Sequence, residues 1–60
     1  MTKQGAIGFA KYEARGRSAW FDVVRTPRGS FDAFPRYADA QPRSDKGVVV
    51  ATFNTYGERV

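Results

Sequence analysis

Arginine and aromatic side chains are the residues of this sequence whose chemistry points most directly to a function. Seven of the ten basic residues are arginine, whose planar guanidinium makes paired hydrogen bonds and stacks on aromatic rings. The residues that contribute most of the binding energy at protein interfaces are tryptophan, tyrosine and arginine. Tryptophan occurs once in this chain. We therefore predict a partner-binding site made of Arg15, Arg17, Trp20, Arg25 and Arg28.

The residues on which most enzymes and metal sites depend are missing. The chain has no histidine and no cysteine, which excludes Ser-His-Asp and Cys-His catalysis and the usual zinc and copper ligands. Its six acidic residues are spread singly, and neither a phosphate-binding glycine loop nor a calcium-loop spacing occurs. We expect a non-catalytic protein with no cofactor and no metal ion.

The net charge of +4 favours an acidic partner and leaves two interpretations open. In the first, the protein docks on and blocks or modulates a protein or nucleoprotein complex. By analogy with small phage and plasmid proteins, this would be an inhibitor of a host system. In the alternative, the chain is a basic β-sheet module that binds DNA or RNA with little sequence specificity. The same arginines would then follow the phosphates, and Trp20 or Tyr12 would stack on bases.

The length of 60 residues predicts one small domain, 1–60, near the lower limit for independent folding. Because so short a chain builds only a small core, we expect that a homodimer could add the missing buried area. The sequence begins without the apolar segment of a signal peptide, and no run approaches the ~20 apolar residues that span a bilayer. We expect a cytoplasmic protein with no membrane partner.

The apolar residues are typical of strands, because leucine is absent and valine and aromatic residues take its place. We predict a mainly β or small α+β fold: an antiparallel meander of three to four strands curled into a partial barrel, with one short helix near 35–40. Alternation over 5–12 predicts the first strand, and 13–17 reads as a hairpin loop around Gly16.

The stretch 18–25 is the predicted centre of the fold. As a strand it places Phe21 and Val23 on one face and Trp20 and Val24 on the other. A helix that begins at Ser18 is the alternative, which the valines disfavour. A strand that is apolar on both faces is buried on both sides, or one face meets a partner or a second copy.

The remaining segments follow from turn residues and valine content. Pro27 and Gly29 predict a turn over 26–29, with a short strand over 30–34 after it. The polar stretch 41–47 predicts a loop, and the valine run predicts a strand over 48–55. We expect residues 1–4 to fray unless they are paired, and the tail 56–60 to fray.

Overall fold

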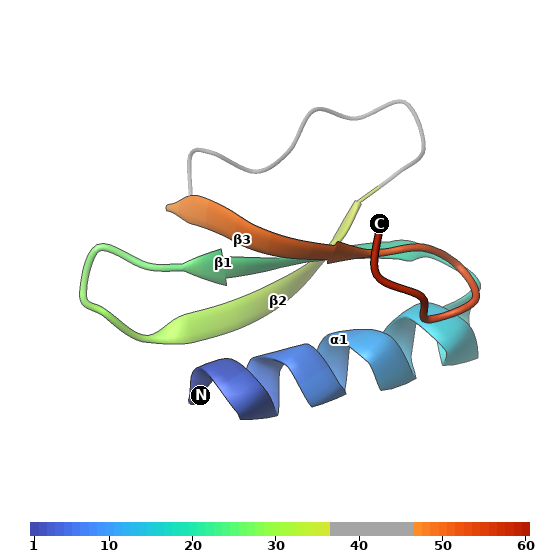
Figure 1. Ribbon diagram of the computed structural model, residues 1–60, viewed down its shortest axis with the longest axis horizontal. Helices are drawn as coiled ribbons and strands as arrows, with labels where there is room; N and C mark the ends of the chain where they lie inside the picture. Colours follow the sequence, from blue (N-terminus) through green and yellow to red (C-terminus); the bar gives the residue numbers. More distant parts are fainter. Residues whose placement is uncertain (37–46) are drawn as a thin grey trace.

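The computed structural model describes residues 1–36 and 47–60 and shows an α+β fold. Its elements, in chain order, are α1 (Lys3–Arg17), β1 (Trp20–Arg25), β2 (Phe31–Arg36) and β3 (Val48–Phe53). The strands form an antiparallel sheet in the order β2-β1-β3, and α1 lies along one face of it (Figure 1). The α+β class and the antiparallel sheet are confirmed. The described residues form three strands in an open sheet, so the fourth strand and the partial barrel are not.

The predicted strand over 5–12 and the hairpin loop over 13–17 are wrong, because both segments belong to α1. Three alanines spaced four residues apart form the buried face of this helix: Ala6, Ala10 and Ala14. Alanine has the highest helix propensity, and a spacing of four returns to the same helical face. The larger residues of 5–12 alternate with small ones, which suggested a strand. The helical spacing was hidden because the residues that carry it are alanines.

Both ends of α1 are capped. The Thr2 hydroxyl accepts a hydrogen bond from the Gly5 N–H at 3.0 Å, which satisfies one of the free amides of the first turn. At the other end Ser18 adopts a left-handed conformation with φ 51°, and its N–H donates to the carbonyls of the last turn. Residues 1–4 were expected to fray unless paired, and Thr2 is paired, so it fixes the start of the helix.

β1 is the central strand and is buried on both sides. Phe21 and Val23 pack against the alanine face of α1, together with Ala51 and Phe53 of β3. The next residues along the strand, Asp22 and Val24, point to the other face and have no exposed surface. Of the two predicted alternatives, burial on both faces is the one observed, so the middle of β1 leaves no open face for a partner or a second copy.

β2 is an edge strand, and this explains how it accommodates a proline. Pro35 lies opposite Phe21, at a position whose backbone groups face away from β1, so its missing N–H removes no bond from the ladder. At the other end of the same edge, the Phe31 N–H donates to the Met1 carbonyl at 3.1 Å. The short helix predicted near 35–40 is wrong at Pro35 and Arg36, which end β2.

Residues 37–46, where the rest of that helix and most of the loop over 41–47 were predicted, lie outside the described residues.

β3 is the other edge, and the C-terminal residues pair with it. The Val60 N–H donates to the Thr52 carbonyl at 3.0 Å, and Arg59 Nη2 donates to the Val50 carbonyl at 3.3 Å. An isolated antiparallel bridge also joins Phe53 to Arg59. The expectation that 56–60 frays is wrong, because these bonds tie the tail to the sheet.

In the part of the chain that the structure describes, no helix is both long and apolar enough to span a membrane.

Candidate binding surface

The C-terminal half of α1 presents a tyrosine and an arginine on its outer face. Tyr12 is 77% exposed, and Arg15, one turn further on, is also exposed. Residues three apart are neighbours on a helix surface, and these two line one hollow together with Gly16. Within the described residues, Arg15 has no ion pair.

A tight turn after β3 places a second tyrosine beside the same arginine. The Asn54 side-chain oxygen accepts hydrogen bonds from the backbone N–H groups of Tyr56 and Glu58, each at 3.0 Å. The Gly57 N–H closes the turn onto the Asn54 carbonyl at 2.9 Å. Asparagine stabilises turns in this way, and here it holds Tyr56 outward with 74% of its surface exposed.

The turn packs directly on the stem of Arg15. Gly57 is buried with φ 77°, and a Cβ added there would lie 2.5 Å from Cγ and Cδ of Arg15. A glycine is therefore required both for the backbone conformation and for the space. The ribbon shows the turn after β3 beside the C-terminal end of α1 (Figure 1). Because the turn packs on its aliphatic stem, Arg15 is anchored at this junction.

Arg15 is common to two adjoining hollows. One is the hollow it shares with Tyr12, and the other is lined by Arg15, Ser18, Thr55 and Tyr56. We call the residues of both hollows the helix-end surface: Tyr12, Arg15, Gly16, Ser18, Thr55 and Tyr56. The two tyrosines have the highest exposure among the exposed large apolar residues. A cation that has no ion pair in residues 1–36 and 47–60 thus shares a hollow with each of two exposed rings.

Arg17, also predicted at the site, makes contacts within the molecule. Its Nε lies 2.7 Å from Glu13 Oε2, and its guanidinium lies 6.0 Å from the centre of the Phe21 ring. An ion pair on a helix surface contributes little stability, but it neutralises the charge that Arg17 would offer to a partner. Arg17 is therefore a weaker candidate than Arg15.

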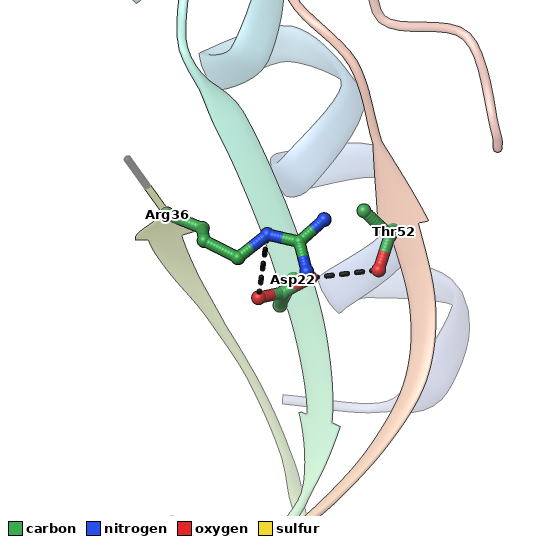
Figure 2. Close-up of polar contacts among 3 residues, drawn as sticks. All are labelled: Asp22, Arg36 and Thr52. Carbon is green, nitrogen blue, oxygen red and sulfur yellow. Dashed lines mark hydrogen bonds and ion pairs between the residues drawn. The ribbon is translucent and has the colours of Figure 1, made fainter. Parts of the chain in front are cut away.

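Trp20 lies on the sheet face opposite α1 and is half-buried. The Arg36 guanidinium lies 5.3 Å from the centre of its ring, within cation–π range. The same Arg36 places Nε 3.5 Å from Asp22 Oδ2, and Thr52 donates its hydroxyl to Asp22 Oδ1 at 2.7 Å (Figure 2). Three strands thus contribute to one polar cluster, and Trp20 packs against it.

Asp22 makes this cluster structural. Its side chain is fully buried in the central strand, whereas that of Arg36 is 16% exposed. At 3.5 Å the contact is an ion pair, too long to be a strong hydrogen bond, and within the described residues Asp22 Oδ2 has no hydrogen bond. The Arg36 charge is therefore what compensates the buried carboxylate on that side.

Arg25 and Arg28 lie at the opposite end of the sheet. Arg25 ends β1 and lines a hollow with Pro27, Gly29 and others, and Arg28 is exposed in the predicted turn, which the Gly29 N–H closes onto the Thr26 carbonyl at 2.9 Å. With a rise of about 3.3 Å per residue, five steps along β1 separate its two ends by about 16 Å. This distance separates Arg25 from Trp20.

The structure therefore divides the five predicted residues among three places. Arg15 and Arg17 lie at the end of α1, Trp20 lies on the far sheet face, and Arg25 and Arg28 lie at the β1–β2 hairpin. Tyr56 was missed because the tail was expected to fray. The spacing of Asn54 and Gly57 was the turn signal that could have found it.

Within residues 1–36 and 47–60, no group of three or more acidic, histidine or cysteine side chains is placed to hold a metal ion. No family model, no curated protein and no solved structure matches this chain.

Proposed function

We propose that this protein is a non-catalytic binding protein that docks on another macromolecule through the helix-end surface. The observation that carries the proposal is that Arg15, exposed and without an ion pair in the described chain, shares one hollow with each of the exposed rings of Tyr12 and Tyr56. Tyrosine and arginine are the types enriched where interface binding energy concentrates. Elsewhere in the described chain, Arg17 and Arg36 have partners within the molecule.

Side chains, rather than a strand edge, carry the contact in this proposal. On β2, Met1 occupies the Phe31 N–H and Pro35 has no N–H to offer. On β3, Val60 and Arg59 occupy backbone carbonyls. Each of these features removes a backbone group that a partner's strand would need, which disfavours the addition of such a strand.

Charge favours an anionic partner. The chain carries a net charge of +4, and Lys11 is exposed one helical turn before Arg15. An acidic face of a protein or of a nucleoprotein complex complements this end of the molecule. If the partner is a host protein, this protein would act as an inhibitor of a host system. The homodimer stays a prediction, and a second copy at this same surface would bring like charges together.

The test reverses charge at each end of the molecule separately. Lys11→Glu with Arg15→Glu changes the helix-end surface, and Arg25→Glu with Arg28→Glu makes the same change in charge at the hairpin. Each variant is immobilised and exposed to extract from the source cells, with and without nuclease treatment. Circular dichroism first establishes that both variants fold.

We expect the helix-end variant to lose the macromolecules that the wild type retains, and the hairpin variant to keep them. Equal retention by both variants would place the binding site elsewhere. No retention by the wild type would reject the docking function.

A further inference from the structure

We infer that the helix-end surface binds single-stranded nucleic acid: Tyr12 and Tyr56 each stack on a base, and Arg15 contacts the phosphates between them. This inference rests on the proposed docking function and names its partner. It starts from the arrangement of the two adjoining hollows, each of which has one tyrosine ring and shares Arg15 with the other.

The exposure of the rings is the first argument. Tyr12 and Tyr56 are 77% and 74% exposed, so their faces are accessible to a planar ligand. Stacking on an aromatic ring binds any base, because every base has a π face. Phe9 lies one helical turn before Tyr12 and is also exposed, which continues the aromatic row along α1.

The position of Arg15 is the second argument. Gly57 packs on its stem, so the arginine is held between the two rings. Arginine binds phosphate through its planar fork. Ser18 and Thr55 line the hollow on the Tyr56 side, and their hydroxyls can donate to phosphate or sugar oxygens. Lys11 adds a further exposed cation, whereas Glu58 after the turn offsets one charge.

The layout of the surface favours nucleic acid over a protein. A stable protein interface buries about 800 Å² per partner around a continuous apolar centre depleted of charge. In the described chain, the two hollows are lined by two tyrosines, one arginine, one glycine and two hydroxyl residues, so no large aliphatic residue joins the two rings into such a centre. Alternation of rings and cations is instead the pattern of single-strand binders. A duplex hides its base faces, so the rings select unpaired strands.

The probe is a fluorescein-labelled dT12 oligonucleotide, whose bases do not pair with one another, followed by fluorescence anisotropy at 50 and 200 mM KCl. We expect binding at low salt that weakens at high salt, because each neutralised phosphate contributes about 0.7 to the salt slope for a single strand. A 12-base-pair duplex that carries the same label should bind more weakly than dT12.

Substitutions separate stacking from charge. Tyr12→Ala and Tyr56→Ala should each weaken dT12 binding by about 5- to 150-fold, the effect of losing one stacked base. Tyr12→Phe keeps the ring and should stay within about twofold of the wild type on the same argument. Arg15→Gln should lower the salt slope by about 0.7, whereas the matched change Arg28→Gln should leave it unchanged.

Three outcomes overturn the inference: no dT12 binding at 50 mM KCl, wild-type affinity in both tyrosine-to-alanine variants, or tighter binding of the duplex than of dT12. If dT12 fails to bind while the Lys11 and Arg15 charge reversals still abolish capture from nuclease-treated extract, the partner is an acidic protein. In that case the docking function stands and the nucleic-acid assignment falls.

Discussion

Among the places in residues 1–36 and 47–60 where an arginine lies near aromatic rings, two differ most in what surrounds them. On the sheet face, Arg36 lies over Trp20. The charge of this arginine faces the buried Asp22, as Figure 2 shows. At the end of α1, Arg15 lies between two exposed tyrosines and has no ion pair within the described residues.

The difference between the clusters separates a structural role from a binding role. The Asp22 cluster uses its arginine to compensate a charge within the fold, so changes there should act on stability. The helix-end surface leaves its cation and rings to solvent, so changes there should act on binding and leave stability nearly intact. Residue type alone does not distinguish the two, because both consist of arginine and aromatic residues.

Of the substitutions considered, Arg36→Met should lower the stability of the fold most. It leaves the Asp22 carboxylate buried with Thr52 as its hydrogen-bond partner, and breaking a buried pair from one side costs about 3 kcal/mol or more. Urea denaturation measures the loss, with Arg28→Met as an exposed control that should stay within about 0.5 kcal/mol of the wild type. The double change Asp22→Val with Arg36→Met should recover much of the loss, because an apolar pair can replace a buried ion pair. A stable Arg36→Met protein would contradict the structural role of this cluster.

Gly57→Ala should have an intermediate effect and should join stability to binding. The new Cβ meets the stem of Arg15, and the alanine has to adopt the positive φ of Gly57. Together these two effects should lower the free energy of unfolding by about 2 kcal/mol. The matched control is Gly8→Ala, where nothing lies within 4 Å of the added carbon, and which should stabilise the helix by up to about 1 kcal/mol. In thermal and urea unfolding, Gly57→Ala should therefore be less stable than the wild type and Gly8→Ala more stable. The same sign for both would mean that Gly57 is not held against Arg15.

Tyr12→Ala should have the smallest effect on stability. Its ring is mostly exposed, so we expect a change within about 0.5 kcal/mol in urea unfolding. Trp20→Ala is the comparison on the other face, and it should cost clearly more because Trp20 is half-buried under Arg36. A loss above about 1 kcal/mol for Tyr12→Ala would assign this ring to the core and would remove it from the binding surface.

Much of the sheet could be predicted from the sequence, because β-branched and aromatic residues carry the strand signal. The predicted strands over 18–25, 30–34 and 48–55 correspond to β1, β2 and β3. β2 continues through Pro35, which its edge position permits. The order β2-β1-β3 places the first strand in the centre and depends on contacts between distant residues, which local patterns do not contain.

The helix and part of the site could not be predicted, for two physical reasons. The buried face of α1 consists of alanines, which contribute little to a hydrophobic pattern dominated by Ile7 and Phe9. The helix-end surface joins Arg15 to Tyr56 across the fold, and the sequence alone gave no reason to pair them. Arg15 was found from its residue type, whereas Tyr56 required the turn that Asn54 and Gly57 build.

The attachment of α1 at both ends has a consequence for the energetics of recognition. Near the start of the helix, the Met1 carbonyl accepts a hydrogen bond from the Phe31 N–H of β2. Near its end, Gly57 packs on the stem of Arg15. Because the helix is held to the sheet at two distant points, the side chains on its outer face project from a backbone that is already ordered. A preorganised surface avoids part of the entropy that ordering would cost on association. The backbone of α1 is therefore in place before a partner arrives, and binding should proceed without a slow conformational step.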